Sequence, residues 1–491
     1  AVSTALVVNL LVFAARYATH PVLLDHVEPS IVCTSWYFAQ GMPIYHEIES
    51  QYRYSLLYGP GQYILNGWAM QLAGPSLYVP KALSAASLAL ALVLLWVCLR
   101  RLGGTGAAWV ALGYLAAACL FFGHMSFWVR SEPFQLLAAA MMLLGATSRR
   151  PVPAMLIYAL GAGIVVNMKL HGVFYALPAW ALLWTLHGWR SATAGAVLAA
   201  AIALAPFALP EVSLGNYIMW LRLAAAHGLD MDFLRTIVKT AAMLGAPLAI
   251  VLLVALPGIN YAVLRRYAGF AAATAAGIIG VILVASKHGS GQHHLIPLLP
   301  LLAAMLAWSI GAVIKRQPSG IWRGRALPAA AVLAGLALAL IGVRRELATL
   351  GSDRWQIAGP ALADVAGILS DYPGRNVQMG AGHAGEDAYP ATFARIDLAL
   401  HGRPQYIDAA VEMDTQLSGL TSPAARLELL RKNSDIVWLI PRGAEPFSMR
   451  TYYASHYGQM LFDEPFRKAF LEHYHPVGQS QLFDIWVRRP Q

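Results

Sequence analysis

The chain has 491 residues, of which 58% are hydrophobic and only 12% are charged, and its mean hydropathy is +0.54. A soluble domain carries about 25% charged residues, so this composition excludes an ordinary soluble protein and favours an integral membrane protein. The net charge of +10 is typical of the Lys and Arg bias of cytoplasmic loops. It does not indicate nucleic-acid binding, because no basic patch is interleaved with aromatic residues.

Apolar segments recur along the chain and predict a mainly α, polytopic bundle of membrane helices. A helix that crosses a bilayer needs about 20 apolar residues, and about eleven segments approach that length. They are residues 1–16, 76–99, 106–122, 132–146, 151–166, 172–186, 191–209, 236–256, 267–286, 295–314 and 326–343. We interpret the first as a retained helix or signal anchor, because no small-residue cleavage site follows it.

Arginines predict the orientation of the bundle, because short cytoplasmic loops collect Lys and Arg. With this count of segments, the basic loops all fall on one side. They contain Arg100, Arg101, Arg149, Arg150, Arg190, Arg265, Arg266 and the cluster 315–325. The alternate loops, and the segment after Val343, are then expected to face the exterior.

The first outward loop, residues 18–75, is much longer than a simple connection requires. It contains two acids, Asp25 and Glu28. Residues 29–40 and 64–72 carry Trp and aliphatic side chains among polar ones, which predicts two helices that lie in the membrane interface. We expect a similar interfacial helix within residues 211–239.

The next outward loops place ionisable groups at the edges of apolar segments. One contains His124, Arg130 and Glu132, and another contains Lys169 and His171. Such groups are costly at a membrane edge and are therefore candidates for function. The alternative is that the longer side chains only extend to the interface.

The fifth outward turn, residues 286–294, is the most concentrated, with Lys287, His288, Gln292, His293 and His294. A metal site is not favoured, because adjacent histidines are expected to point in different directions on a helix and no His-x3-His spacing occurs. Glycines beside a lysine, followed by a helix, are typical of a phosphate-binding turn. A solvated basic turn is the plainer alternative.

Residues 344–491 are more polar and predict a soluble, extracytoplasmic α/β domain after the membrane domain of residues 1–343. We expect strands at 376–380, 435–440 and 482–487, and helices at 422–432 and 464–473. Alternating helices and strands favour a small α/β sandwich.

The outward position of every polar cluster restricts the chemistry. No Walker motif or nucleotide-binding loop is present, and an enzyme acting outside the membrane has no nucleotide sugar available. A lipid would have to carry its activated substrate. Acids with cations suit glycosyl transfer, because a carboxylate can take a proton from an acceptor hydroxyl and cations can stabilise a departing phosphate.

The sequence resembles the integral-membrane GT-C glycosyltransferases, specifically the branch with protein O-mannosyltransferases and the lipid A aminoarabinose transferase. The resemblance covers about residues 1–343 and rests on five motifs taken in order. They are Asp25-x-x-Glu28-Pro29, Gly41-x-Pro43-x-Tyr45, Tyr58-Gly-Pro-Gly61, Arg130-Ser-Glu132-Pro133 and Lys287 running into Ile296-Pro-Leu-Leu-Pro300. It implies a GT-C fold, a polyprenyl-phosphate-sugar donor such as one on undecaprenyl phosphate, and inversion at the anomeric carbon.

The resemblance also implies residue roles. An acid of the first outer loop would be the general base. Relatives carry adjacent Asp and Glu, whereas Val27 takes the Asp position here, so Asp25 and Glu28 both remain candidates and Asp25 is favoured. Predicted donor-phosphate contacts are Lys287, His288, Gln292, His293, Arg130 and Lys169. Predicted substrate contacts are Tyr58, His124, Glu132 and His171. A divalent metal, Mg or Mn, stays open.

Two other functions remain open at this point. A transporter or flippase for a lipid-linked glycan would show repeated halves and polar residues at the bilayer midplane. A non-catalytic scaffold would not need reactive groups on five outer loops. The expected location is a bacterial inner (plasma) membrane with the site facing the periplasm or the exterior. The sugar, a hexose or a pentose, and the acceptor, a glycan, a lipid or a protein, are not fixed by the sequence.

Overall fold

The computed structural model describes residues 1–55, 57–255, 261–316, 321–385, 388–420, 422–432, 435–451 and 457–490. Contacts divide the chain into two compact units. Unit 1 comprises residues 1–18, 81–206 and 229–348, and unit 2 comprises residues 19–80, 207–228 and 349–491. The predicted domain boundary after Val343 stays a prediction.

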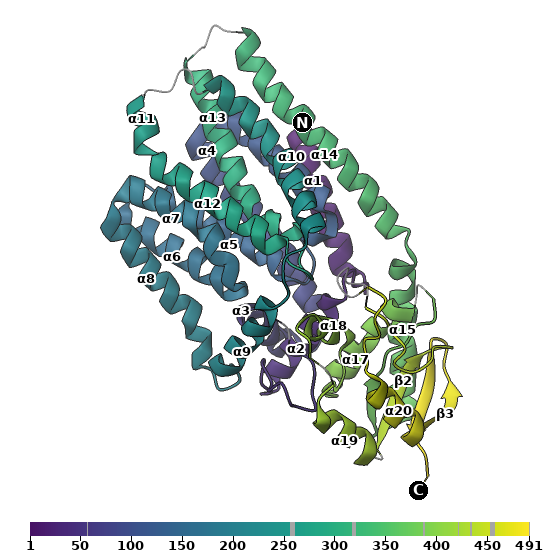
Figure 1. The fold of residues 1–491 in the computed structure, drawn as a ribbon. Coiled ribbons are helices and arrows are strands. Elements are labelled where there is room, and N and C mark those ends of the chain that lie inside the picture. The colour runs from purple at the N-terminus through teal and green to yellow at the C-terminus, as the bar shows by residue number, and fades with distance from the viewer. Residues whose placement is uncertain are drawn as a thin grey trace. The chain divides into compact units, whose positions relative to one another are not determined.

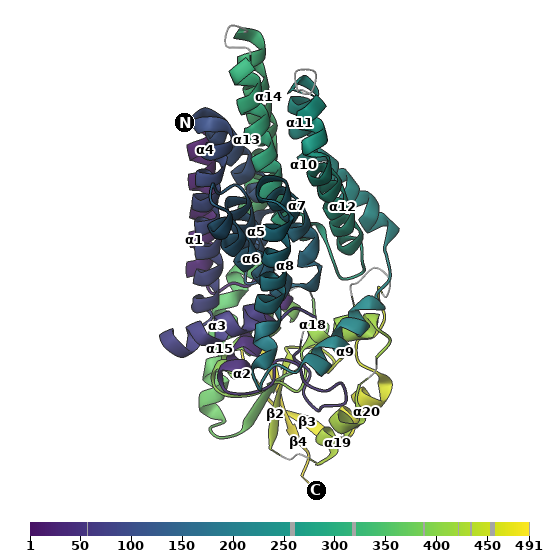
Figure 2. The same ribbon diagram turned by 90° about the vertical axis from the view of Figure 1, so that its left-hand side faces the viewer.

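Unit 1 is built from helices, most of them long (Figures 1 and 2). They are α1 (Val2–Thr19), α4 (Tyr78–Phe122), α5 (Ser131–Ala146), α6 (Pro151–Met168), α7 (Val173–His187), α8 (Trp189–Leu204), α10 (Met231–Ala255), α11 (Tyr261–Arg266), α12 (Ala268–Ala285), α13 (Leu299–Arg316) and α14 (Ile321–Leu350). Every apolar segment predicted from the sequence overlaps one of these helices. The predicted helical bundle is therefore confirmed.

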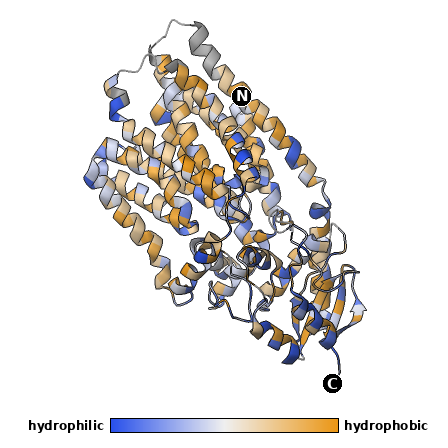
Figure 3. Cartoon of the chain, viewed as in Figure 1, coloured by the Kyte–Doolittle hydropathy of each residue, from blue (hydrophilic) through white to orange (hydrophobic). Residues whose placement is uncertain are grey.

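Seven helical segments in the described part of the chain are long and apolar enough to cross a bilayer. The sequence predicted about eleven spans, and the difference arises at α4, α5, α7 and α14, the last of which is not among the seven. Two predicted segments join in α4, which bends at Gly104 with φ 83° and ψ 172°. Helices α5 and α7 have only 16 and 15 residues. Figure 3 shows hydrophobic residues along much of the length of these helices, as expected of an integral membrane protein.

Helix α6 packs against both α5 and α8, and α12 packs against α7. Small residues allow the close approach. A Cβ built on Gly161 of α6 would lie 2.6 Å from the carbonyl oxygen of Ala138 in α5. Membrane helices commonly meet through small residues in this way.

Unit 2 contains a four-stranded sheet with the order β1-β2-β4-β3. The strands are β1 (Asn376–Met379), β2 (Ile436–Pro441), β3 (Tyr474–Gln479) and β4 (Phe483–Arg488). The three predicted strands are confirmed as β1, β2 and β4, and β3 was missed. Strand β3 contains Pro476 and Gly478, residues depleted in strands, and its register with β4 is irregular between them.

The sheet is covered on both faces, which confirms the predicted α/β sandwich. The covering helices are α15 (Asp353–Asp371), α16 (Ala388–Ala391), α17 (Arg395–Leu400), α18 (Ala409–Leu417), α19 (Ala424–Lys432) and α20 (Glu464–His473). Val437 and Leu439 of β2 belong to the core with α15, whereas Trp438 and Ile440 belong to the core with α20. Alternate side chains of a strand point to opposite faces, so β2 is buried on both. The two helices predicted from the sequence correspond to α19 and α20.

Residues of the first loop form part of unit 2 through α2 (Val27–Ala39) and α3 (Gly61–Ala73). Both predicted helices therefore exist. Helix α2 is buried on nearly all sides, because it packs against α3, α17 and α18. The predicted helix of residues 211–239 divides into α9 (Leu214–Ala225) and the start of α10. Whether these helices lie in the membrane interface stays a prediction.

Candidate active site

A buried ionic cluster in unit 1 surrounds Glu132, which is 0% exposed. The Nζ atom of Lys169 donates to Glu132 Oε1 at 2.5 Å, and Arg130 Nε lies 3.9 Å from Glu132 Oε2. Lys169 and Arg130 are themselves only 4% and 5% exposed. Charges are buried in proteins when they are paired. Three predicted residues from two separate outward loops are therefore brought together.

Local structure explains how these side chains meet. Arg130 has an extended backbone before α5, and Glu132 lies in the first turn of that helix. A carboxylate is favoured there by the helix dipole, and Pro133 is well tolerated because the first-turn N–H groups have no partner within the helix. Lys169 lies just past the end of α6, where its backbone becomes extended. A cation is favoured at that end of a helix.

Two adjacent histidines complete the cluster from the segment Gln292–Leu298. Arg130 Nη2 lies 3.3 Å from His293 Nε2, which is also 3.8 Å from Glu132 Oε1. An arginine only donates, so His293 Nε2 is the acceptor in this hydrogen bond. His294 Nδ1 lies 3.1 Å from His171 Nε2.

The expectation that His293 and His294 point in different directions is wrong. Their ring centroids lie 4.4 Å apart, with an angle of 34° between the ring planes. Glu132 and Arg130 lie next to the His293 ring, and His171 lies next to the His294 ring. Both rings therefore belong to the same cluster.

Two aromatic residues of this cluster were missed. Trp128 Nε1 donates to Glu132 Oε2 at 2.8 Å, and the guanidinium of Arg130 lies 4.3 Å from the centre of the Trp128 ring. Tyr175 donates from its hydroxyl to the carbonyl of His294 at 2.8 Å. Trp128 could have been found, because it precedes Glu132 by four residues within an outward loop already singled out.

The cluster carries a positive surplus. Arg130 and Lys169 provide two cations, and Glu132 provides one carboxylate. Burial and, to a smaller extent, the charge of Lys169 lower the pKa of His171 to about 3, so this ring is neutral at pH 7. The charge of Lys287 also disfavours protonation of His171. An arrangement with this surplus attracts an anion.

Two other predicted residues of unit 1, His124 and His288, have different partners. The backbone N–H of His124 donates to Glu346 Oε1 at 2.7 Å, and its ring lies 3.5 Å from the same oxygen. His288 lies 3.4 Å from Asp230. Gln292 begins the segment that carries the two histidines. Their roles in substrate or phosphate binding stay predictions.

The two acids of the first loop, in unit 2, differ in their environments. Glu28 is 0% exposed, and its Oε2 accepts from the backbone N–H groups of Leu24 at 2.6 Å and Asp25 at 2.9 Å. Asp25 Oδ1 accepts from the N–H of Val27 at 3.0 Å, and the Asp25 side chain is 18% exposed. Glu28 therefore shapes the turn before α2, whereas Asp25 is the more accessible carboxylate.

Two arginines from residues 349–491 bind this turn, and neither was predicted as a site residue. Arg354 Nη1 donates to the carbonyl of Leu24 at 3.2 Å, and Arg395 Nη2 donates to the carbonyl of His26 at 3.2 Å. Tyr58, also in unit 2, accepts at its main-chain oxygen from the hydroxyl of Tyr45 at 2.6 Å. A substrate contact of Tyr58 stays a prediction.

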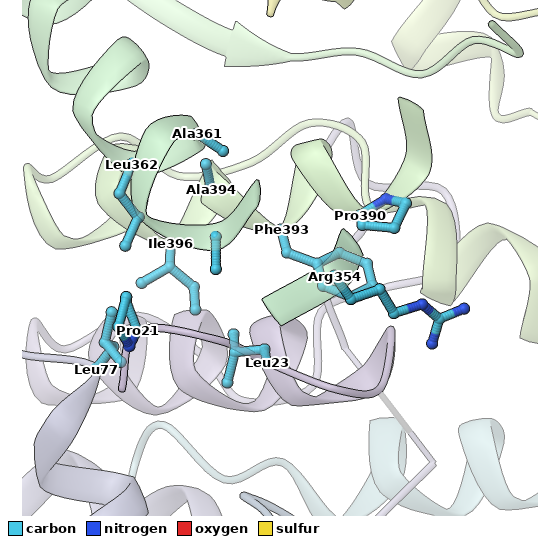
Figure 4. Close-up of a pocket in the computed structure, with 11 residues that line it drawn as sticks. Pro21, Leu23, Leu77, Arg354, Ala361, Leu362, Pro390, Phe393, Ala394 and Ile396 are labelled. Atoms are coloured by element: carbon cyan, nitrogen blue, oxygen red, sulfur yellow. The ribbon is translucent and has the colours of Figure 1, made fainter. Parts of the chain in front are cut away.

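An apolar cavity borders the same turn (Figure 4). Pro21, Leu23 and Leu77 line it together with side chains from α15, α17 and the segment between α16 and α17, including Ala361 and Phe393. The guanidinium of Arg354 points away from the apolar side chains in this view. The cavity volume is about 20 Å³, which is room for about one water molecule. It is a packing gap and too small for a sugar or an acyl chain.

A metal site was left open by the sequence. Within the described ranges, no group of three or more His, Cys, Asp or Glu side chains is arranged to hold a metal ion. A requirement for Mg or Mn stays untested.

No protein-family model and no curated protein matches this sequence. Among solved structures, the chain is similar to ArnT, the lipid A aminoarabinose transferase, from Cupriavidus metallidurans. ArnT bound to undecaprenyl phosphate is 14% identical and covers 99% of both chains with a TM-score of 0.59. The apo form is 12% identical and covers 100% of both chains with a TM-score of 0.61.

The chain has the GT-C fold. The fold expected from the five sequence motifs is therefore confirmed. The likeness to ArnT extends beyond residues 1–343, where those motifs lie, because it covers nearly the whole of both chains.

Proposed function

We propose that this GT-C protein is a membrane glycosyltransferase that transfers a sugar from a polyprenyl-phosphate-linked donor to an acceptor hydroxyl. The observation that carries the proposal is the buried cluster at Glu132, with its surplus of positive charge, in a unit of apolar helices. A polyprenyl-phosphate-sugar has an apolar chain, which suits the apolar helices, and a negative phosphate, which suits the positive surplus of the cluster. The solved ArnT structure with undecaprenyl phosphate supports the same class of donor.

Arg130 and Lys169 are the residues that we assign first to the donor phosphate. Glu132 Oε1 accepts from Lys169 Nζ at 2.5 Å, which fixes the position of this ammonium group. Stacking on Trp128 fixes the plane of the Arg130 guanidinium. Lys287 provides further charge, His293 provides a further hydrogen-bonding group, and His288 and Gln292 are secondary candidates. Cations that are already ordered stabilise a leaving phosphate without reorganisation cost.

Asp25 is the general base in this proposal. Glu28 is less suited, because its carboxylate already accepts two backbone hydrogen bonds and is fully buried. Asp25 takes the proton of the acceptor hydroxyl as the oxygen bonds to the anomeric carbon. The bond from that carbon to the phosphate oxygen breaks, and its electron pair leaves with the polyprenyl phosphate. Attack opposite to the leaving group inverts the anomeric configuration.

The remaining assignments complete the proposal. Tyr58, His124 and His171 contact the sugar or the acceptor. The arginines of the alternate loops support an orientation in which the site faces the exterior, which is the periplasm if the membrane is a bacterial inner membrane. The transferred sugar is a hexose or a pentose, and the acceptor is a glycan, a lipid or a protein.

Transfer from defined donors tests the proposal. The purified protein in lipid vesicles is incubated with undecaprenyl-phosphate-linked hexoses and pentoses, each radiolabelled in the sugar, and with envelope fractions as acceptors. We expect label in the acceptor fraction with at least one donor. If no donor gives transfer and the labelled lipid moves between the leaflets of the vesicle, the protein is a flippase and this proposal is refuted.

A further inference from the structure

The side chain of Arg395 is at the centre of a buried network in unit 2. It is 2% exposed, and it binds Asp408 through Nε at 3.3 Å and Nη2 at 3.1 Å. Two donors on one carboxylate form the bidentate geometry for which a guanidinium is suited. The ion pair fixes the plane of the Arg395 fork.

The same Nη2 atom reaches the first loop. Besides Asp408, its two N–H groups have as acceptors the hydroxyl of Ser30 at 2.9 Å and the carbonyl of His26 at 3.2 Å, so one N–H is shared between two acceptors. His26 follows Asp25 directly, and Ser30 lies in the first turn of α2. One guanidinium therefore holds both the backbone next to Asp25 and the helix turn that follows.

A second arginine acts on the other side of Asp25. Arg354, from α15, donates to the carbonyl of Leu24 at 3.2 Å. The carbonyls of the residues before and after Asp25 thus each accept from an arginine of residues 349–491. Two fixed carbonyls restrain the backbone torsions between them, and those torsions set the direction of the Asp25 side chain.

We propose that Arg395 and Arg354 are positioning residues that fix the main chain on both sides of Asp25, so that residues 349–491 contribute to catalysis. The inference rests on the proposed function for its kinetic consequence, but not for its structural one. A general base has to stay within about 0.5 Å of its working position, which a free turn of the chain does not provide.

Stability alone is a poor explanation of the Arg395 network. A buried ion pair is often no more stabilising than apolar residues of similar volume. A pair that served only to fill the core would not need a third and a fourth contact. The contacts of Arg395 to Ser30 and His26 are directed at the segment that carries the proposed base.

Three variants separate positioning from folding. Arg395→Lys keeps the charge beside Asp408 but loses the fork that spans Ser30 and His26. Ser30→Ala removes one contact and leaves the ion pair intact. Arg354→Lys weakens the hold on Leu24. Arg375→Lys is the matched control, because Arg375 forms a partly exposed ion pair with Asp435 in the same unit at 2.8 Å.

Hydrogen exchange of the peptide covering residues 22–34 is the first measurement. We expect exchange at least about tenfold faster in the Arg354→Lys/Arg395→Lys double variant, since freed amides exchange through local opening. The peptide covering β2 is expected to be unchanged in the double variant, and both peptides in the Arg375→Lys control. Unchanged exchange of residues 22–34 in the double variant overturns the inference. If that variant does not fold, the same comparison is made with Ser30→Ala.

Kinetics with the labelled donor form the second measurement. We expect kcat to fall about 10- to 100-fold in the double variant, with the KM for the donor within about twofold of wild type, because binding is kept and orientation is lost. Faster exchange with unchanged kcat overturns the positioning role. If the wild-type protein has no transferase activity but exchange is faster in the double variant, the proposed function is refuted. The structural role of the two arginines then still holds.

Discussion

Lys169 and Glu132 form a buried ion pair, with Nζ 2.5 Å from Oε1, although 37 residues separate them in the sequence. The pair joins the end of α6 to the start of α5. Arg130, His293 and Trp128 surround the same carboxylate. The cluster therefore depends on Glu132 both for its geometry and for its charge balance.

Glu132→Gln is expected to destabilise the protein by about 3–5 kcal/mol, because it leaves the buried cations Lys169 and Arg130 without their counter-charge. Chemical unfolding in a fixed detergent measures the free energy of unfolding. The control is Asp232→Asn, which breaks an ion pair with Arg235 whose side chains are 88% and 78% exposed. Equal stability of Glu132→Gln and wild type would contradict the central place of Glu132.

A double variant examines the same pair more closely. Glu132→Gln/Lys169→Met removes both charges of the 2.5 Å contact. It is expected to be more stable than Glu132→Gln alone, because the uncompensated ammonium is gone. The coupling energy from the double-mutant cycle is the measured quantity. A coupling energy of zero would show that the two side chains do not stabilise each other.

Arg130→Lys is expected to raise the KM for the donor by about 10- to 100-fold, since lysine keeps the charge but loses the planar fork stacked on Trp128. The measurement is the initial rate of transfer over a range of donor concentrations. Arg235→Lys, at an exposed position, is the control and is expected to keep the wild-type KM. A wild-type KM in Arg130→Lys would remove Arg130 from the donor site.

The stability of unit 2 is expected to fall below about pH 6.5 because of His46. His46 Nε2 accepts from the backbone N–H groups of Tyr54 at 3.2 Å and Ser55 at 3.3 Å, which requires an unprotonated nitrogen. Burial lowers the pKa of His46 to about 3. The unfolded chain therefore binds a proton that the folded chain does not between these two pH values, and stability is lost as the pH falls.

The measurement is the free energy of unfolding from pH 7.5 to 4.5. One such proton contributes a slope of up to about 1.36 kcal/mol per pH unit. His46→Gln is expected to flatten the profile, because its amide does not titrate. His401→Gln, at a side chain that is 59% exposed, is the control for replacing a histidine by glutamine. Identical profiles for His46→Gln and wild type would refute this role of His46.

The sequence predicted the membrane helices and the members of the ionic cluster for a common physical reason. Long apolar segments and ionisable residues at their ends are both conspicuous against a hydrophobic background. Arg130, Glu132 and Lys169 could therefore be selected one by one. Their mutual contacts could not, because they depend on how α5 and α6 pack.

Arg395 and Asp408 show where prediction from the sequence fails. They lie in a segment of ordinary composition, and Arg395 contacts Ser30 across 365 residues. A charged residue in a polar domain does not stand out, and only the fold places it beside the first loop. Strand β3 escaped prediction for a different reason, since its Pro476 and Gly478 are typical of turns.

The turnover number of Asp25→Asn compared with Glu28→Gln tests the central claim most directly, using the lipid-linked donor and the acceptor identified for the wild-type protein. A general base contributes about 10²- to 10⁴-fold, and the account predicts a loss of that size for Asp25→Asn. Glu28→Gln should keep more activity and lose stability, because its carboxylate holds the turn before α2. Full turnover in both variants would contradict an acid of the first loop as the base.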